Sequence, residues 1–340
     1  MTAIRAWTAA TPGAAFTLDT FDLGPLAAEE VEVRVEHCGI CHSDLSMWHN
    51  HWGMSRYPFV PGHEVIGTVV ALGDRAGDKG LVIGQRVGIG WNAGSCQHCG
   101  ACIDGDPHLC GSVRPTIVGR HGGFAERLRC HWLWAVPIPA ALPAAEVGPM
   151  LCGGITVFAP LLQHRVLPTA RIGVVGIGGL GHLAVKFAAA WGCEVTAFTS
   201  SPDKHAEALA LGAHRVVSST DRAALKALAG AFDLIIVTVN ASLDWSALIA
   251  TLAAKGVLHV VGAVPEPIPV QAFDLLLGQR AIAGSPTGSR SAIDAMLAFA
   301  ARHQIAPITE HFPMASVNEA MAHLKAGKAR YRIVLDADFS

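Results

Sequence analysis

The alternation of apolar and polar positions divides the chain into two parts of different character. In the first part, which extends to about residue 135, apolar side chains recur with a period of two or in short β-branched runs, as in half-buried strands. Glycine and proline separate these segments at short intervals, which is typical of a compact β-rich fold with long loops. The predicted strands are 31–35, 65–72 and 86–89.

Beyond about residue 144, apolar strands alternate with segments of helical period. Right-handed crossovers between such strands produce a parallel, doubly wound α/β sheet. The predicted strands are 171–175, 193–199, 215–217, 234–239 and 256–261, and the helices are 180–191, 202–211, 222–228 and 245–252. After residue 284 we expect a helix at 292–303 and a strand at 332–335, in a tail that returns to the first domain.

Length and composition limit the classes of protein. The 340 residues suffice for two domains with large cores, and 51% of them are apolar. The formal net charge of −2 provides no basic surface for nucleic acid. No apolar run reaches the ~18 to 20 residues of a membrane span, and the N-terminus lacks a signal-peptide pattern. We therefore expect a cytoplasmic protein with neither nucleic acid nor membrane as partner.

A glycine-rich segment follows the strand predicted at 171–175. Gly176, Gly178 and Gly181 match G-x-G-x-x-G where a strand ends and a helix begins. In dinucleotide sites the first glycine permits a tight turn, the second admits the pyrophosphate and the third lets helix and strand pack closely. The helix N-terminus adds free N–H groups for the phosphates. We predict a dinucleotide site and not merely a structural loop.

The residues after the second strand of this domain bear on the choice between NAD and NADP. NAD sites usually have an acid about 20 residues beyond the glycines, which binds the ribose hydroxyls. That position is Ser200 here. Ser201 and Pro202 have the residue types of an N-cap and a first helical position, so Asp203 is expected in the first helical turn. Since hydroxyl groups and Lys204 can accept a 2′-phosphate, the sequence favours NADP(H).

Four of the nine cysteines follow the pattern C-x2-C-x2-C-x7-C in a polar loop. Four thiolates can complete a tetrahedral shell around Zn²⁺ with no open position, as in structural sites. An iron–sulfur cluster and a redox dithiol are the alternatives, but the loop has no second cysteine cluster and no thioredoxin-like context. The odd number of cysteines argues against a disulfide framework. The predicted ligands are Cys96, Cys99, Cys102 and Cys110.

A second group of possible ligands is scattered along the chain, at Cys41, His63, Glu64 and Cys152. Two cysteines and a histidine leave one position of a zinc ion open, as catalytic sites require. Each residue alone also fits ordinary packing, because buried cysteines usually behave as small hydrophobic side chains. Spacing alone leaves both interpretations open. Packing is the expected role of the remaining cysteines, Cys38, Cys130 and Cys193.

Together these motifs resemble the zinc-containing medium-chain dehydrogenases/reductases. The chain is most similar to the cinnamyl-alcohol-dehydrogenase-like branch, which includes bacterial NADPH-dependent aldehyde reductases. The similarity lies in CGICHSDL at 38–45, GHE at 62–64, the four-cysteine loop, LCGGITV at 151–157 and GIGGLG at 176–181. It implies a GroES-like β-rich catalytic domain at 1–148 and 285–340, a structural-zinc lobe at about 93–112 and a Rossmann domain at 149–284.

The resemblance also implies roles for individual residues. Cys41, His63 and Cys152 would bind a catalytic zinc with water or Glu64 at the remaining position, which makes two Zn²⁺ per chain. Asp44 would orient His63, as ligating imidazoles require. The expected cofactor-binding residues are Thr156, Gly176, Gly178, Gly179, Leu180, Gly181, Ser200, Ser201, Lys204, Thr238, Val261, Gly262, Ser285 and Thr287.

The proton route differs from the family pattern. Ser43 would bind the substrate oxygen and begin the relay. Many relatives place a histidine five residues after the first zinc cysteine, where this chain has Ser46. The route through Ser43, the cofactor ribose and water, or through His42 or His51, stays open.

These residues predict a zinc-dependent alcohol dehydrogenase/aldehyde reductase that transfers hydride between NADP(H) and primary alcohols or aldehydes. An apolar pocket wall would favour aromatic or medium-chain substrates, although each candidate could equally be a core residue: Trp48, Trp52, Trp91 and Met47. The resemblance implies a homodimer. The alternatives are an NAD-dependent alcohol dehydrogenase, a zinc-independent reductase of the same fold, and a non-catalytic protein that binds zinc and nucleotide.

Overall fold

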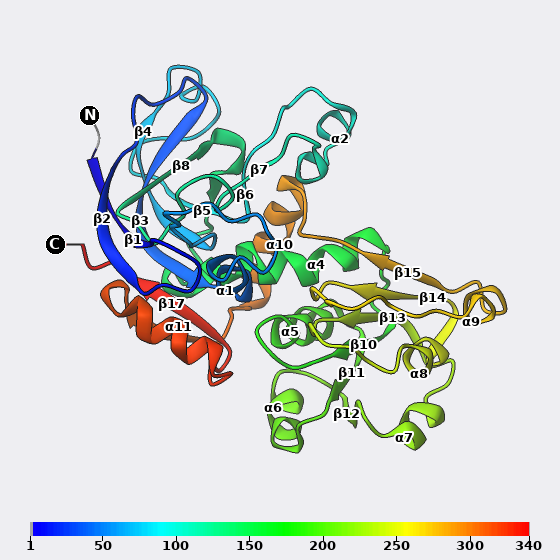
Figure 1. Cartoon of the computed structure of the whole chain (residues 1–340). Coiled ribbons are helices and arrows are strands. Elements are labelled where there is room, and N and C mark those ends of the chain that lie inside the picture. The colour runs from blue at the N-terminus through cyan, green and yellow to red at the C-terminus, as the bar shows by residue number, and fades with distance from the viewer. Residues whose placement is uncertain (1–2, 340) are drawn as a thin grey trace. The chain divides into compact units, whose positions relative to one another are not determined.

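The computed structural model describes residues 3–339, and the chain divides into two compact units (Figure 1). Unit 1 comprises Met1–Gly153 and Thr287–Ser340, and unit 2 comprises Gly154–Pro286. The domain boundaries expected from the sequence, after residues 148 and 284, lie a few residues earlier. The shift matters for two predicted site residues, because Cys152 belongs to unit 1 and Ser285 belongs to unit 2.

Unit 1 is built on a seven-stranded sheet, and its strand order is β16-β17-β3-β4-β5-β9, with β8 also paired to β3. Only β16 and β17 pair in parallel. The strands are β3 (Glu30–Ile40), β4 (Val65–Leu72), β5 (Arg86–Ile89), β8 (Arg127–His131), β9 (Val136–Pro137), β16 (Thr309–Pro313) and β17 (Arg332–Asp336). Two small sheets pair β1 (Ala3–Ala9) with β2 (Phe16–Asp22) and β6 (Asn92–Gly94) with β7 (Arg114–Pro115).

The helices of unit 1 are short, apart from two near the C-terminus. The α-helices are α1 (His42–Trp48), α2 (Gly100–Ile103), α3 (Ala144–Val147), α10 (Arg290–His303) and α11 (Val317–Lys325). The 3₁₀-helices are η1 (Pro107–Leu109), η2 (Trp132–Trp134), η3 (Gly148–Leu151) and η5 (Met314–Ser316).

The core of unit 1 follows from the strand pattern. Val31, Val33 and Val35 on β3 are buried, as their period of two predicts. The predicted strands 65–72 and 86–89 are β4 and β5 with the same bounds. Strand β17 pairs antiparallel with β3, so the C-terminal tail completes the sheet of unit 1.

Unit 2 contains a six-stranded sheet in which all strands are parallel, in the order β12-β11-β10-β13-β14-β15. The strands are β10 (Arg171–Val175), β11 (Glu194–Thr199), β12 (Arg215–Ser218), β13 (Phe232–Val237), β14 (Leu252–Val260) and β15 (Ala281–Gly284). The helices are α4 (Gly153–Gln163), α5 (Gly181–Trp191), η4 (Pro202–Lys204), α6 (His205–Ala210), α7 (Arg222–Ala227), α8 (Trp245–Ala250) and α9 (Ala272–Leu276).

This strand order is that of the Rossmann fold, which confirms the predicted fold class. The order reverses between β10 and β13, and ligands of such sheets bind at the carboxyl ends of the strands beside this reversal. The loop that follows β10 contains Gly176, Gly178 and Gly181. The glycine motif therefore lies where the fold places a nucleotide.

Some elements differ from the prediction. The helix expected at 202–211 begins as the 3₁₀ turn η4 and becomes α-helical only at His205, a common arrangement at helix N-termini. Strand β14 begins at Leu252, four residues before the predicted start at 256, with an irregular register against β13. Strands β1, β2, β8, β15 and β16 and helices α4 and α11 were among the elements that were not predicted. The strands are short or lie at a sheet edge, where periodicity is weak, whereas α11 buries Val317, Ala320 and Met321 on one face, a helical pattern that the sequence did contain.

Within residues 3–339, no single helix is long and apolar enough to cross a membrane. One bent pair of consecutive helical segments, Ala144–Leu151 and Gly153–Gln163, satisfies the length and composition test together.

Candidate active site and metal centres

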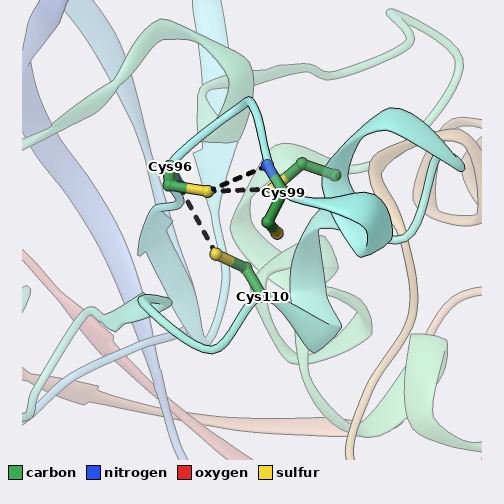
Figure 2. Close-up of side chains that lie close together, drawn as sticks. Cys96, Cys99 and Cys110 are labelled. Carbon is green, nitrogen blue, oxygen red and sulfur yellow. Dashed lines mark hydrogen bonds between the residues drawn. The ribbon is translucent and has the colours of Figure 1, made fainter.

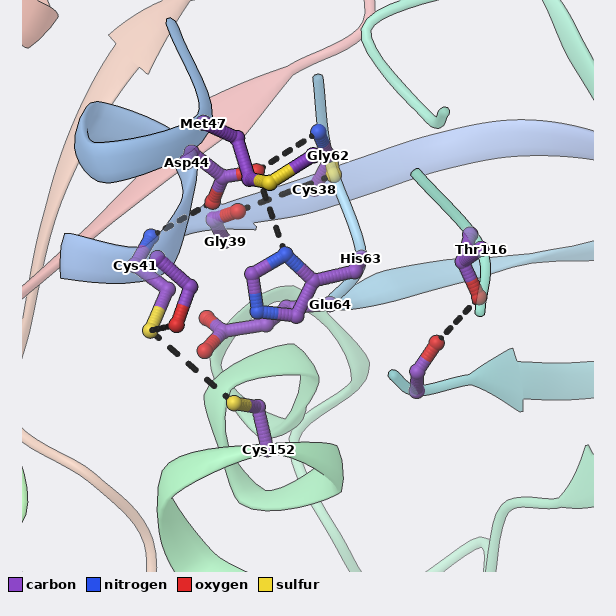
Figure 3. Close-up of polar contacts among 12 residues, drawn as sticks. Cys38, Gly39, Cys41, Asp44, Met47, Gly62, His63, Glu64, Thr116 and Cys152 are labelled. Carbon is purple, nitrogen blue, oxygen red and sulfur yellow. Dashed lines mark hydrogen bonds and ion pairs between the residues drawn. The ribbon is translucent and has the colours of Figure 1, made fainter. Parts of the chain in front are cut away.

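The first cluster of possible metal ligands begins where β3 passes into α1. Cys41 has extended backbone angles and is the N-cap of α1. Its backbone N–H donates to Asp44 Oδ2 at 2.8 Å, so a carboxylate occupies the first turn of the helix, where the dipole favours negative charge. This hydrogen bond holds the carboxylate of Asp44 close to Cys41 (Figure 3).

Asp44 orients the imidazole of His63. The buried Oδ1 of Asp44 accepts from the backbone N–H of Gly62 at 2.9 Å and lies 3.1 Å from Nδ1 of His63. Burial alone would lower the pKa of His63, but the carboxylate of Asp44 outweighs burial and raises that pKa well above its usual range. Nε2 of His63 is buried and has no hydrogen-bond partner among the described residues. The site thus favours a cation at Nε2, which fits a metal ligand held by a carboxylate.

Four side chains converge at this point, although they come from three separate stretches of sequence (Figure 3). One ligand atom from each lies within 4.8 Å of the others, and all four residues are buried: Cys41, His63, Glu64 and Cys152. The sulfurs of Cys41 and Cys152 are 3.9 Å apart. Tetrahedral zinc–thiolate bonds of about 2.3 Å require about 3.8 Å between sulfurs. The donor set and its spacing therefore fit zinc.

Other side chains predicted near this site divide into two groups. The ring of Trp91 lies edge-on to His63 with centroids 5.0 Å apart, and Trp52 lies 6.2 Å from Trp91. Trp91 and Trp52 thus remain candidates for a pocket wall. Met47 is fully buried in a small apolar cluster and is a core residue, whereas Trp48 is partly buried and packs on Phe16 with ring centroids 5.2 Å apart.

The second cluster is the four-cysteine loop, which follows β6 and contains α2 and η1. Figure 2 shows three of its cysteines, Cys96, Cys99 and Cys110, close together. Its four sulfurs lie within 4.8 Å of one another, and those of Cys96 and Cys102 are 3.9 Å apart. Backbone N–H groups of Cys99 and Ser112 donate to the sulfurs of Cys96 and Cys110 at 3.4 and 3.3 Å. All nine cysteines are free thiols. The geometry fits a closed tetrahedral metal shell.

The thiols of this second cluster have shifted pKa values. Hydrogen bonds from the backbone N–H groups of His98 and Cys99 lower the pKa of Cys96 to about 6. Desolvation and the neighbouring thiols raise the pKa of Cys102 to about 11. Four adjacent thiols cannot all ionise unless a cation offsets their charge. A divalent metal ion held by these four cysteines would supply that charge.

In the glycine loop of unit 2, two of the three motif glycines lie too close to neighbouring atoms for any other residue to fit. Gly176 has φ +92°, where a β-carbon would be strained and would lie 2.3 Å from Val239. A β-carbon on Gly181 would lie 1.8 Å from the carbonyl oxygen of Gly176, but one on Gly178 would meet no atom within 4 Å. The backbone at Gly178 is thus open to a ligand, and α5 begins at Gly181. Leu180 is the N-cap of α5.

The other predicted cofactor residues lie at separate places in the chain, and Thr238 contacts the glycine loop directly. Thr238 Oγ1 donates to the carbonyl oxygens of Val175 and Gly176 at 2.9 and 3.0 Å. Val261 and Gly262 follow β14 and both donate to Val237 O. Thr156, on α4, donates to Pro286 O at 3.4 Å, and Ser285 precedes that proline. Thr287 is buried in unit 1.

The segment after β11 lies as the sequence suggests. Ser200 is exposed beyond the end of β11, and Ser201 is the N-cap of η4 with Pro202 at N1. Asp203 is in the first turn of that helix. Nζ of Lys204 donates at 2.6 Å to the carbonyl oxygen of Ile177 inside the glycine loop. Lys204 therefore brings a positive charge to the loop.

Comparisons with known proteins agree with this geometry. The family model "Alcohol dehydrogenase GroES-like domain" matches residues 27–140, and "Zinc-binding dehydrogenase" matches residues 179–302. An aldehyde reductase from Synechocystis is 51% identical over 93% of each chain. The chain belongs to the zinc-binding alcohol dehydrogenases. It is therefore an oxidoreductase, in the branch that contains cinnamyl alcohol dehydrogenases.

Solved structures place this dehydrogenase in the same branch. A cinnamyl alcohol dehydrogenase from Sorghum bicolor has a TM-score of 0.93, with 36% identity over 98% of each chain. A cinnamyl alcohol dehydrogenase from Helicobacter pylori, solved in complex with NADP(H), has a TM-score of 0.90 and 28% identity over 98% of each chain. A cinnamyl alcohol dehydrogenase from Arabidopsis thaliana is 39% identical to this chain, over 94% of this chain and 92% of the Arabidopsis protein.

Sequence reasoning missed one charged residue of the dehydrogenase's metal site. Arg332 on β17 is buried and forms an ion pair with Oε1 of Glu64, whereas Oε2 of Glu64 has no hydrogen-bond partner among the described residues. Burial raises the pKa of Glu64 to about 7 although Arg332 opposes the shift. A β-carbon on Gly39 would lie 2.1 Å from Glu64 Oε2, so only glycine fits there. The only signal for Arg332 was an arginine in an apolar strand.

The altered proton route is also defined in part. Ser46 is buried on α1 and does not face solvent, but His42 and His51 are exposed. Ser43 Oγ lies 3.7 Å from Cys41 Sγ, at the metal cluster. A relay that begins at Ser43 therefore needs a partner other than Ser46.

Proposed function

We propose that this dehydrogenase transfers a hydride between NADP(H) and primary alcohols or aldehydes, with aromatic or medium-chain aliphatic aldehydes as substrates. The observation that carries the proposal is the buried convergence of Cys41, His63 and Cys152, whose spacing suits zinc. Among residues 3–339, nothing forms a hydrogen bond with Nε2 of His63. The relatives named aldehyde reductase and cinnamyl alcohol dehydrogenase support the substrate class.

Cys41, His63 and Cys152 would hold the catalytic zinc, and Glu64 or water would take the fourth position. When bound, such a zinc ion acts as a Lewis acid toward a carbonyl oxygen. Asp44 fixes the imidazole of His63, and Arg332 holds one oxygen of Glu64. Because Arg332 already neutralises Glu64, we expect water or substrate, and not Glu64, to be the usual fourth ligand.

Ser43 would donate a proton to the substrate oxygen from Oγ during reduction. Its hydroxyl lies beside Cys41, and it is partly exposed, so after each reduction it can regain a proton from solvent or from the cofactor ribose. Many relatives have a relay histidine where this chain has Ser46. His42 or His51, which are both exposed, would take over that role here. Trp91 and Trp52 would form an apolar wall that excludes water and accepts an aromatic or alkyl group.

The cofactor would be NADP(H), bound by unit 2 as the Rossmann domain, while unit 1 would act as the catalytic domain. Ser200, Ser201 and Lys204 offer hydroxyl groups and one positive charge where NAD sites have a carboxylate. The relative from Helicobacter pylori that was solved with NADP(H) supports this choice. Gly176, Gly178 and Gly181 would admit the pyrophosphate, with Gly179, Leu180, Thr238, Val261, Gly262, Thr156, Ser285 and Thr287 around the remainder of the cofactor.

The four-cysteine cluster would hold a structural zinc, which gives two Zn²⁺ per chain. We further propose a cytoplasmic homodimer. Residues around α9 support the dimer, because Phe273, Leu276 and Leu277 are 70, 66 and 86% exposed, and β15 is an edge strand. Light scattering should give twice the chain mass, and a variant with Leu277→Glu and Phe273→Glu should be monomeric.

The test is turnover with benzaldehyde or hexanal, followed through nicotinamide absorbance with NADPH and with NADH, before and after zinc chelation. Rapid NADPH-dependent turnover that is lost on chelation is the expected result. A preference for NADH would overturn the assignment of Ser200 and Lys204. Absence of turnover with either cofactor would favour the non-catalytic alternative, and turnover that survives complete loss of zinc would favour a zinc-independent reductase.

A further inference from the structure

Two histidines and a serine form a continuous hydrogen-bonded chain inside unit 2. Nε2 of His164 lies 2.8 Å from Nδ1 of His259, and Nε2 of His259 lies 2.9 Å from Oγ of Ser285. His164 directly follows α4, His259 is in β14 and Ser285 directly follows β15. His259 is fully buried, whereas His164 and Ser285 are partly exposed. The chain thus connects the molecular surface, through the sheet, to the loop after β15.

An imidazole is costly at the position of His259. Its strand neighbours in the parallel sheet are Ile236 and Ala283, and the adjacent Leu258 is buried. A buried polar group lowers stability unless each of its polar atoms has a partner. Both nitrogens of His259 do have one. An aliphatic side chain would fill this position without needing His164 or Ser285, so packing alone does not account for the histidine.

Both rings are neutral at neutral pH. Burial, and then the nearby His164, lower the pKa of His259 to about 4, and burial also lowers the pKa of His164. A neutral imidazole has one donor and one acceptor nitrogen, so the chain has a single direction at any moment. If His164 donates to His259, then His259 donates to Ser285 Oγ and the serine hydroxyl is left to donate to a ligand. If the direction is reversed, the serine donates inward. In both cases Oγ of Ser285 is fixed.

The next residue of the same loop is anchored to the same helix. Thr156, in the first turns of α4, donates to Pro286 O at 3.4 Å, and His164 follows the end of α4. Helix α4 therefore holds residues 284–286 at two points, directly through Thr156 and indirectly through His164 and His259. Two independent anchors on adjacent residues restrict the path of this loop more than either would alone.

We propose that His259 and His164 are positioning residues, which hold Ser285 and residues 284–286 in the conformation that binds the nicotinamide end of the cofactor. The inference rests on the proposed function, in which Thr156, Ser285 and Thr287 contact the cofactor. It assigns a role to a buried histidine pair that the zinc chemistry does not use. Loss of the hydrogen bond between His259 and Ser285 should release the loop and weaken cofactor binding more than it slows the chemical step, whereas loss of the bond between His164 and His259 should have a smaller effect.

Three substitutions at His259 separate its two hydrogen bonds. The amide of His259→Gln reaches the position of Nε2 and keeps the bond to Ser285, whereas the amide of His259→Asn reaches only the position of Nδ1. His259→Leu keeps neither. We expect the Kd of NADPH, measured by its fluorescence on the whole enzyme, to rise about 10-fold in His259→Leu and His259→Asn and less than about 3-fold in His259→Gln. The KM for NADPH should rise in parallel while kcat changes less.

A double-mutant cycle tests whether the effect passes through the serine. Ser285→Ala should weaken NADPH binding as much as His259→Leu, and the double variant should bind no more weakly than either single variant. His164→Phe should have a smaller effect, because His259 still contacts Ser285. The matched control is His214→Gln, a histidine of the same unit whose Nδ1 accepts only from the backbone N–H of Val195, and it should leave the Kd unchanged.

The outcomes distinguish this inference from the proposed function. If wild-type protein does not bind NADPH, the proposed function is wrong. If wild-type protein binds NADPH but His259→Leu loses only thermal stability, the pair is merely structural and the inference is overturned. Additive effects of Ser285→Ala and His259→Leu would also overturn it. Should His259→Leu fail to fold, the contrast between His259→Asn and His259→Gln, with Ser285→Ala, decides the same question.

Discussion

The two cysteine clusters have similar ligand types but differ in how far apart their residues lie in the sequence and in how deeply they are buried. Cys96 and Cys110, at the ends of the four-cysteine loop, are 14 residues apart, whereas the paired thiols Cys41 and Cys152 are 111 residues apart. The first cluster is partly exposed and its sulfurs accept hydrogen bonds from nearby backbone N–H groups. The second is buried and surrounded by charged side chains. The first can form from local sequence alone, but the second needs the whole of unit 1 to be folded.

Their chemical consequences differ accordingly. Four thiolates close the shell of a metal ion, so the four-cysteine cluster can contribute only stability. In the buried cluster Cys41, His63 and Cys152 would bind the ion and Glu64 is paired with Arg332, so under the proposed function one coordination position would stay available. Asp44 and Arg332 are the extra groups that an open site requires, because a ligand that must stay fixed when substrate exchanges needs its own support.

The largest expected effect comes from Cys152→Ser. Removal of one thiolate should lower kcat by more than about 1,000-fold, since the zinc-bound state that stabilises charge on the substrate oxygen is lost. Zinc content should fall from two ions per chain to one, with the circular dichroism spectrum unchanged. Metal analysis and turnover measure this together. Cys193→Ser is the matched control, because Cys193 is buried in unit 2 outside both clusters. Undiminished turnover in Cys152→Ser would show that the catalytic site is elsewhere.

Cys110→Ser should have the reverse pattern. Loss of the metal from the four-cysteine cluster should lower the free energy of unfolding by about 3 kcal/mol or more, as loss of a structural metal does. The molecules that remain folded should retain kcat within about 3-fold, because the open site is intact. Urea unfolding and turnover at a temperature well below the midpoint measure the two quantities. A selective fall in kcat with unchanged stability would mean that the clusters have been assigned the wrong way round.

Asp44→Asn should have a smaller effect on the open site. The oxygen of the asparagine can still lie at the position of Oδ1, beside the backbone N–H of Gly62 and Nδ1 of His63. Its amide group then replaces Oδ2, which accepts from the backbone N–H of Cys41, and the negative charge behind His63 is lost. Such changes behind a metal ligand typically cost 10- to 100-fold in metal affinity or activity. Zinc titration with a competing chelator should show the loss, and Asp104→Asn, an exposed residue of the four-cysteine loop, should not. If the two variants bound zinc with equal affinity, Asp44 would have no role in holding the metal ligand His63.

The same contrast explains how much of the site was predictable. The C-x2-C-x2-C-x7-C spacing is a local property, so sequence alone predicted a metal site whose sulfurs do converge. Spacing did not distinguish Cys41, His63 and Cys152 from packing residues, because their proximity depends on strand pairing across β3, β4 and β17. The family resemblance supplied that link. Arg332 could not be found, since nothing in an apolar strand indicates which carboxylate its arginine will meet.

The fold likewise contains elements that the local sequence pattern predicted and elements that it did not. Strong periodicity located β4, β5, β10 and α5 within one residue, and right-handed crossovers then fixed the class of unit 2. Strands β1, β2 and β16 were missed because their apolar alternation is weak. The described side chains of β16 include no fully buried one, β2 buries only Phe16, and the buried positions of β1 include small or polar residues such as Ala6 and Thr8. The chain of His164, His259 and Ser285 was equally invisible, because three residues on three elements meet only through the packing of the sheet.

The smallest prediction concerns the backbone of the four-cysteine loop. Gln97, between Cys96 and Cys99, has φ +64°, a left-handed conformation that costs a residue other than glycine about 1 kcal/mol or more. If Cys96 and Cys99 hold this turn through a bound metal ion, its strain affects the stability of the four-cysteine loop and not catalysis at the buried cluster. Gln97→Gly should then change the free energy of unfolding by less than about 1 kcal/mol, since the relief of strain is offset by greater freedom of the unfolded chain and by loss of the hydrogen bond to Ser95. Gln97→Val, with a β-branched side chain in the same conformation, should lower it by about 2 kcal/mol. Neither variant should alter kcat. The comparison is urea unfolding of both variants with zinc bound, and equal stabilities of the glycine and valine variants would mean that the turn relaxes and that the four-cysteine cluster does not hold it.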